Sequence, residues 1–126
     1  MNRPSTIAIA IVVAIVAISV ASLLISQRPV PKDANAVVIN MTARQWNYTP
    51  SEIRVKEGQT VILHIKSIDV PHGFVIEEYR INVFLTPGET VDVRFTANQV
   101  GEFQYFCNVF CGTGHPNHKG KLIVEK

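Results

Sequence analysis

The chain has 126 residues, of which 47% are hydrophobic and 17% are charged, and it contains two cysteines. This length supports one folded domain. The formal net charge of +2 arises near the N-terminus, because residues 33–126 alone hold nine basic and ten acidic side chains. A nucleic-acid-binding domain concentrates positive charge on its folded body, so this distribution argues against nucleic acid as a partner.

The first predicted element is an apolar helix over residues 6–26, a run without a charged side chain. At 1.5 Å per residue it reaches about 31 Å, which matches the hydrocarbon core of a bilayer. We therefore predict an N-terminal transmembrane anchor within residues 1–26. The alternative is a cleaved signal peptide, for which residues 34–36 have the small-x-small pattern of a cleavage site. Both interpretations place the C-terminal domain outside the cytoplasm.

Residues 27–36 follow as a short linker stiffened by two prolines. From residue 37 to residue 126 we predict a single domain. Its short stretches alternate hydrophobic and polar residues and are separated by turn signals at residues 57–58 and 87–88. The clearest stretches are residues 53–56, 61–66, 90–95, 103–107 and 122–124. This pattern predicts an all-β sandwich of seven or eight strands, with no competing helical segment.

The most informative segment lies between the last two predicted strands. It is a glycine-containing loop that holds Cys107, Cys111, His115 and His118. Such a loop can curl so that thiols and imidazoles point inward. His72 can supply a further donor, because in a sandwich a neighbouring strand end lies beside the loop. Thiolate with imidazole is the ligand set preferred by copper and zinc.

Four kinds of site are compatible with these residues. A disulfide is common outside the cytoplasm, but here it would close little chain and leave the histidines unexplained. Structural zinc on both cysteines with His115 and His72 has a plausible donor set. A mononuclear blue-copper centre needs only one cysteine. Two thiolates that bridge two copper ions, each capped by one imidazole, use every strong donor once. We favour this last arrangement, which suits electron transfer rather than hydrolysis.

Together, several motifs resemble the dinuclear copper domain of subunit II of the haem-copper cytochrome oxidases. They lie between residues 37 and 125, and comprise Gln45-Trp46, residues 67–74, Pro87-Gly88-Glu89, Gly101-Glu102-Phe103 and the Cys-x-x-x-Cys-Gly-x-x-His loop. The resemblance implies a cupredoxin-like Greek-key β-sandwich. It also implies a copper-binding electron-transfer subunit of a membrane terminal oxidase, with its domain on the extracytoplasmic side of the cell membrane.

The resemblance further implies the roles of individual metal ligands. Cys107 and Cys111 would bridge the two copper ions. His72 and His115 would each cap one of them. The carbonyl oxygen of Val109 would make a weak axial contact.

Electron flow is also implied by the resemblance. In the family the centre accepts electrons from cytochrome c or a small copper protein and passes them to haem in subunit I. Trp46 matches the aromatic residue at which electrons enter, although the residues alone favour a packed or half-exposed aromatic. The alternative function is a free-standing membrane-anchored cupredoxin that transfers electrons or delivers copper outside an oxidase.

The chain departs from the family pattern in three places. It has one predicted anchor, whereas most subunits II have two. Val109 replaces a glutamate that contributes to a magnesium site, so no such site is expected. His118 replaces a methionine ligand, and imidazole is the stronger donor. If His118 binds, the two copper ions become unequal and the potential falls; the alternative is that it turns to solvent beside Lys119. For His64, on a polar strand face, we expect no role.

Overall fold

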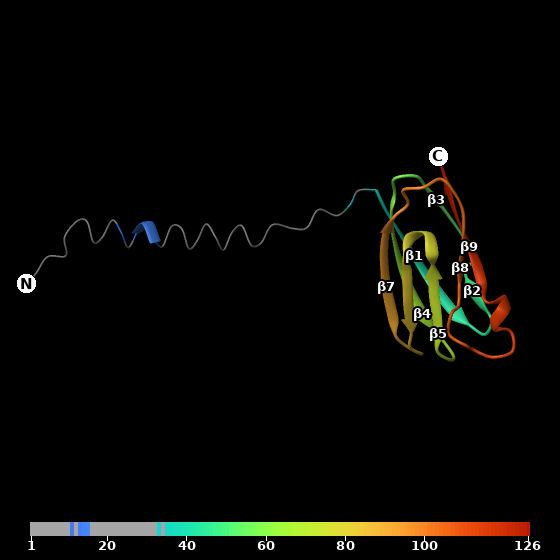
Figure 1. Ribbon diagram of the computed structural model, residues 1–126. Helices are drawn as coiled ribbons and strands as arrows, with labels where there is room; N and C mark the ends of the chain where they lie inside the picture. Colours follow the sequence, from blue (N-terminus) through green and yellow to red (C-terminus); the bar gives the residue numbers. More distant parts are fainter. Residues whose placement is uncertain (1–10, 12, 16–32, 34) are drawn as a thin grey trace, which may run out of the picture. The chain divides into compact units, whose positions relative to one another are not determined.

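The computed structural model describes residues 11, 13–15, 33 and 35–126. The predicted anchor and linker lie largely outside the described residues. Among the residues that are described, no helix is long and apolar enough to cross a membrane. Two β-sheets facing each other make up the C-terminal unit (Figure 1). The predicted all-β sandwich is therefore confirmed.

The first sheet has four strands in the order β2-β1-β4-β7. Their bounds are β1 Ala36–Arg44, β2 Asn47–Thr49, β4 Thr60–Ser67 and β7 Thr90–Thr96. Strand β1 runs parallel to β4, which is antiparallel to β7. Successive side chains of a strand point to opposite faces, and Val61, Leu63 and Ile65 of β4 are accordingly fully buried.

The second sheet has five strands in the order β3-β9-β8-β5-β6. Their bounds are β3 Glu52–Lys56, β9 Lys119–Glu125, β8 Gly101–Phe106, β5 His72–Ile76 and β6 Ile81–Leu85. Two single-turn 3-10 helices, η1 Glu77–Tyr79 and η2 His115–Asn117, lie in the connections. Neither was predicted, because three residues are too few to show a helical period. The nine strands of the described part exceed the predicted seven or eight.

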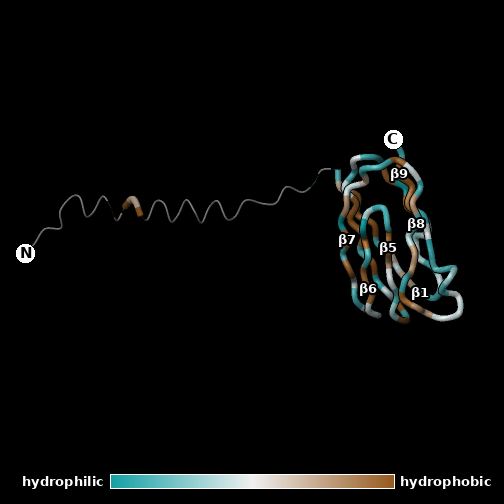
Figure 2. The backbone as a smooth tube through the Cα atoms, in the orientation of Figure 1, coloured by the Kyte–Doolittle hydropathy of each residue, from teal (hydrophilic) through white to brown (hydrophobic). Residues whose placement is uncertain are grey.

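Hydrophobic residues recur along the strands (Figure 2). Their buried side chains form one hydrophobic core cluster. An aromatic group formed by Tyr48, Phe74 and Tyr105 has ring centroids 5.3–5.5 Å apart. The Tyr48 hydroxyl donates to the Gly73 carbonyl at 2.5 Å, and the Tyr105 hydroxyl donates to the Pro50 carbonyl at 2.9 Å. Both buried hydroxyls are thus paired, as burial requires.

Three connections meet at one end of the sandwich. They are the turn between β1 and β2, the segment that leads into β5, and the long loop between β8 and β9. The first two are joined by a hydrogen bond from the Ile68 N–H to the Ala43 carbonyl, 3.1 Å long. The base of the long loop is closed by a bond from the Cys107 N–H to the His118 carbonyl, 3.0 Å long. This end of the sandwich therefore brings together residues that are far apart in the sequence.

Candidate metal centre

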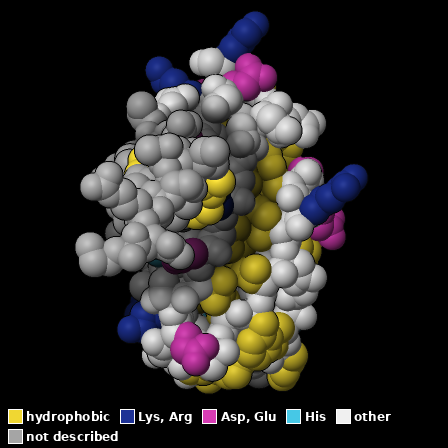
Figure 3. All heavy atoms as spheres, turned by 90° about the vertical axis from the view of Figure 1, so that its left-hand side faces the viewer, with side chains coloured by type: hydrophobic (Ala, Val, Ile, Leu, Met, Phe, Trp, Pro, Cys, Tyr) yellow, Lys and Arg dark blue, Asp and Glu magenta, His cyan; other side chains and the backbone are white. Residues whose placement is uncertain are grey.

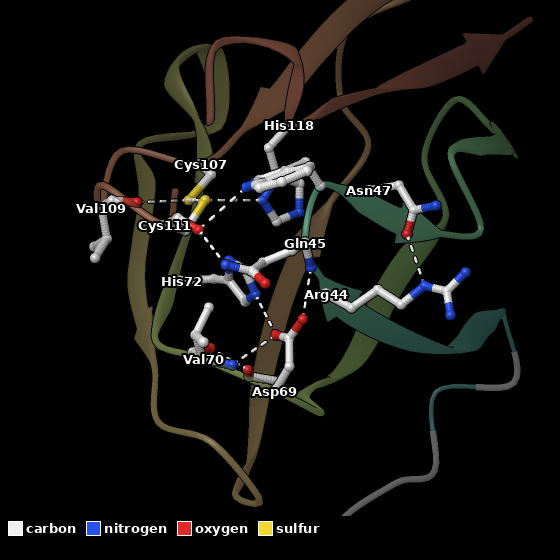
Figure 4. Close-up of polar contacts among 12 residues, drawn as sticks. Arg44, Gln45, Asn47, Asp69, Val70, His72, Cys107, Val109, Cys111 and His118 are labelled. Atoms are coloured by element: carbon white, nitrogen blue, oxygen red, sulfur yellow. Dashed lines mark hydrogen bonds and ion pairs between the residues drawn. The ribbon is translucent and has the colours of Figure 1, made fainter. Parts of the chain in front are cut away.

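Four metal-binding side chains converge at this end of the sandwich. They are His72, Cys107, Cys111 and His118, and one ligand atom of each lies within 4.8 Å of the others. All four side chains are buried. Figure 4 shows them gathered around the two sulfur atoms. The two sulfur atoms are 3.8 Å apart and both thiols are free. The structure therefore has no disulfide between Cys107 and Cys111.

The strands fix where each donor lies. His72 is the first residue of β5, while Cys107 follows β8 and His118 precedes β9. The Gly73 N–H donates to the Cys107 sulfur at 3.3 Å. A Cβ atom on Gly73 would come within 1.9 Å of the Asn108 side-chain oxygen, so a larger residue at this position would require the Asn108 side chain to move.

The orientation of His72 is set by Asp69. One carboxylate oxygen of Asp69 accepts from the His72 Nε2 at 2.7 Å and from the Val70 N–H at 2.6 Å. The other accepts from the Gln45 N–H at 2.7 Å. Burial by itself raises the pKa of Asp69, but these hydrogen bonds outweigh it and hold the pKa below its usual value. With Nε2 bound to the carboxylate, Nδ1 of His72 is left buried and without a hydrogen-bond partner.

His118 lies inside the cluster and not in solvent. Its side chain is 1% exposed, and its ring lies against Tyr48 with centroids 4.2 Å apart. Its Nδ1 is 3.6 Å from the Cys111 sulfur, and its Nε2 is buried without a partner. Burial, followed by the nearby His72, lowers the pKa of His118 to about 4. The imidazole is therefore neutral at neutral pH, the form that binds metal.

His115 and Val109 contact the sulfur pair from outside the four-residue cluster. His115 lies in η2 and is half-buried, with its Nδ1 3.4 Å from the Cys111 sulfur. The Val109 carbonyl accepts a hydrogen bond from the Cys107 thiol at 3.1 Å. The structure thus places the predicted donors next to the sulfurs. His118 clusters with His72 and the two cysteines, whereas His115 lies outside this cluster.

The thiol of Cys111 is held in its neutral form when no cation is present. Burial, reinforced by the neighbouring Cys107, raises the pKa of Cys111 to about 12. A metal must therefore displace protons before thiolate ligands form. Two thiols, the unpartnered Nδ1 of His72 and the Nδ1 of His118 beside the Cys111 sulfur fit a soft metal ion, because sulfur and imidazole are the donors that such an ion prefers.

Trp46 and Gln45 support the loop through one shared acceptor. The Trp46 Nε1 donates to the Cys111 carbonyl at 3.1 Å, and the Gln45 Nε2 donates to the same oxygen at 2.8 Å. The indole lies over Gly112 and Gly114, where a Cβ on Gly114 would come within 2.2 Å of the ring. Trp46 is itself 38% exposed, so it links the surface to the backbone of a sulfur ligand.

Sequence reasoning assigned no role to Gln45 or Asp69. Gln45 stands beside the predicted Trp46, and Asp69 lies three residues before the predicted His72. This spacing to a histidine was the available signal, since ligating histidines usually bond a carboxylate with their second nitrogen. His64 has a similar but exposed partner, Asp92, with its Nδ1 2.5 Å from a carboxylate oxygen.

Hydrophobic side chains are exposed around the loop. Phe110, between the two cysteines, is 79% exposed, and Phe84 of β6 is 56% exposed. Both line a shallow hollow of about 410 Å³ together with Val70 and Val109. On the face drawn in Figure 3, hydrophobic side chains form a band and gather again at the lower end of the domain. An exposed group of apolar residues is typical of an interaction surface.

Comparison with known proteins identifies the family of the chain. The sequence profile of the cupredoxin-like domain matches residues 8–124. Cytochrome c oxidase subunit 2 of Thermus thermophilus is 37% identical over 101 residues, which cover 80% of this chain and 75% of that protein. A chain in a cryo-EM structure of a heme-copper terminal oxidase dimer is 25% identical, with a TM-score of 0.66 and 95% of each chain covered.

The fold alone extends to a more distant structure. The periplasmic domain of subunit II of cytochrome oxidase (CoxB) from Bradyrhizobium japonicum matches with a TM-score of 0.66 and 19% identity, covering 78% of this chain and 88% of that one. The resemblance found in the sequence motifs is thereby confirmed. The chain belongs to the cupredoxin-like family and, within it, to the relatives of cytochrome c oxidase subunit 2.

Proposed function

We propose that the chain is a copper-binding electron-transfer subunit of a membrane haem-copper terminal oxidase. The observation that carries this proposal is the buried cluster of two thiols and two imidazoles, with a third imidazole beside it. Soft sulfur and imidazole donors favour copper. The relationship to cytochrome c oxidase subunit 2 supports copper as the resident metal.

In the proposed centre, Cys107 and Cys111 would be the thiolates shared by two copper ions. His72 and His115 would each bind one ion, the Val109 carbonyl would be a weak ligand, and His118 stands where the family has methionine. Copper supplies the chemistry, which is the gain and loss of one electron. The chain's residues hold the donors in fixed positions, so that little structural change accompanies this electron transfer.

Rigidity is supported by hydrogen bonds on both sides of the cluster. Asp69 fixes His72 and is itself fixed by two backbone N–H groups. The loop that carries Cys111 is held by Gln45 and Trp46. Burial of the four donors excludes water from the metal. Such preorganisation keeps the cost of changing the charge of the metal low.

Electrons enter the centre through the exposed apolar side in this proposal. Trp46 is partly exposed and hydrogen-bonded to the carbonyl of Cys111, so one hydrogen bond and the cysteine itself connect it to a sulfur. Phe110 and Phe84 give the donor an uncharged surface on which to dock. The donor is cytochrome c or a small copper protein, and the acceptor is haem in subunit I.

The proposed location follows from the relatives and the N-terminal sequence. The related CoxB domain is described as periplasmic, which supports an extracytoplasmic C-terminal domain for this chain. The apolar run of residues 6–26 would anchor it as a single-pass membrane protein. Residues 27–36 would then separate the domain from the membrane surface.

Purification of the native full-length chain from detergent-solubilised membranes tests the oxidase assignment. We expect a many-helix subunit and haem to co-purify with the chain, and the complex to oxidise reduced cytochrome c or a reduced copper protein. Recovery of the copper-loaded chain without haem would contradict the oxidase assignment and favour a free-standing anchored cupredoxin. A colourless chain that retains zinc would contradict both.

A further inference from the structure

The donors around the sulfur pair fall into two unequal groups. The inner group consists of His72 and His118, whose ring centroids are 4.6 Å apart in a perpendicular arrangement. The outer group consists of His115 and the Val109 carbonyl. Both groups share Cys107 and Cys111. Among the described residues, the ligand atoms of the inner group and of the two cysteines all lie within 4.8 Å of one another, and His115 is not in this set.

Two distances among the inner group and the sulfurs match the edges of one tetrahedron, and all four ligand atoms lie within 4.8 Å of one another. With metal–sulfur bonds of about 2.3 Å and metal–nitrogen bonds of about 2.0–2.1 Å, the expected edges are about 3.8 Å between sulfurs and about 3.6 Å between sulfur and nitrogen. The structure has 3.8 Å between the two sulfur atoms. It has 3.6 Å between the Cys111 sulfur and the His118 Nδ1. The four donors are therefore close enough to enclose a single ion once the cluster contracts around it.

The inner group is also buried and held in place by its neighbours. His72 is 0% exposed and His118 is 1% exposed, and each has a buried ring nitrogen without a hydrogen-bond partner. Asp69 fixes the ring of His72, and contact with Tyr48 fixes the ring of His118. Leaving a buried polar atom unpaired is costly, so the Nδ1 of His72 favours an ion that binds it. The Nδ1 of His118 already faces the Cys111 sulfur at 3.6 Å.

The outer group lacks these features. His115 is only half-buried, and its ring packs against Phe110, which is 79% exposed. Its fourth donor is a neutral carbonyl oxygen, a weaker ligand for a soft ion than imidazole. No carboxylate holds His115 among the contacts of the described residues. An ion in this group would be held less tightly than an ion in the inner group.

We propose that the centre fills in two steps, and that the first ion occupies a closed four-coordinate site made by His72, Cys107, Cys111 and His118. His118 completes this site, because its imidazole stands where the family has the weaker thioether donor of methionine. The inference rests on the proposed function only for the sulfur pair that both ions share. It further assigns to this chain a stable one-metal form in which His115 remains free.

Zinc titration of the full-length protein tests this directly. Zn²⁺ serves as the probe because it has the filled d shell of Cu⁺, favours tetrahedral sites and cannot be oxidised. Under anaerobic reducing conditions, native mass spectrometry and a competing chelator should give one tightly bound zinc ion per chain. His118→Ala should weaken this binding by at least about tenfold, whereas the matched variant His115→Ala should change it by less than about threefold.

Two outcomes would overturn the proposal: equal weakening of zinc binding by both variants, or no weakening of zinc binding in His118→Ala. Circular dichroism of each metal-free variant checks that the fold is retained. His118→Met keeps a side chain of similar size and should also weaken zinc binding. Zinc affinity does not depend on haem or on electron transfer. The titration therefore tests this proposal even if the oxidase assignment is wrong.

Discussion

The two ends of the sandwich are completed in different ways. At the end away from the metal centre, backbone groups satisfy one another: Gly58 N–H donates to the Ala97 carbonyl at 2.8 Å, and Glu57 N–H donates to the Glu125 carbonyl at 2.7 Å. At the metal end, two buried ring nitrogens lack partners and Phe110 is exposed. The first end is complete as a protein structure. In our proposal, the second is completed by a metal ion inside and a partner protein outside.

Replacing Cys111, a proposed bridging thiolate, should have the largest effect of the changes considered, because it removes the stabilisation that copper gives the metal end. Copper binding to the folded wild-type protein should stabilise it by about 2.7 kcal/mol or more once the free metal exceeds the dissociation constant a hundredfold. In Cys111→Ser the sulfur shared by both donor groups is absent, so this stabilisation should disappear. Thermal unfolding of the full-length chain with and without copper measures the effect. A Cys111→Ser protein that gains as much stability from copper as the wild type would contradict the shared role of Cys111.

Acidification should weaken the metal end through His118. Its pKa is about 4 in the folded state, below the usual value, so between about pH 6.5 and pH 4 the unfolded chain binds a proton that the folded chain does not. The metal-free wild type should therefore lose about 2–3 kcal/mol of stability between about pH 7.5 and pH 4.5 through this group. Denaturant unfolding at both pH values measures the loss.

His118→Met is the control for that pH dependence. Asp69 also has a lowered pKa and loses stabilising contacts on acidification, but the variant retains Asp69. The difference between the two proteins therefore isolates the imidazole. If both lose the same amount of stability, His118 does not titrate as its buried position requires.

The two aspartate–histidine pairs allow a matched comparison. Asp69→Asn removes the carboxylate that fixes His72, and metal affinity should fall by about tenfold or more. Asp92→Asn makes the same change beside His64, an exposed pair remote in sequence from the cluster, and should leave metal affinity unchanged. Competition with a chelator measures both variants. Equal effects would show that the substitution acts through net charge and not through the orientation of His72.

The smallest effect is expected at the end away from the metal. Arg54 pairs with Glu52 and Glu125 on the surface, where water screens such contacts. Arg54→Gln should leave both the melting temperature of the metal-free protein and its copper affinity unchanged. A marked loss of copper affinity in this variant would show that the two ends are coupled through the sheets.

The sequence was sufficient for the parts of the molecule that depend on local patterns. Alternation over residues 61–66 and 90–95 predicts the two strands whose inward residues form the core, and the structure has them there. The cysteine loop was found from its donors and their spacing. His72 was added by the expectation that a strand end lies beside the loop, and the structure brings it there.

Contacts between distant segments could not be derived in the same way. The position of His118 depends on whether its ring fits over Tyr48, which lies 70 positions earlier in the chain. Gln45 reaches both Asp69 and Cys111 because three connections meet at the end of the sandwich. Neither contact leaves a periodic signal, so the sequence left His118 between two alternatives and assigned Gln45 no role.

Electron paramagnetic resonance of the copper-loaded full-length protein tests the central claim most directly, when combined with the copper content per chain. The proposed centre should hold two copper ions per chain and, when oxidised, show one unpaired electron for every two ions, with visible absorption from the thiolates. One unpaired electron per copper ion, or a colourless protein that does not retain copper, would contradict it.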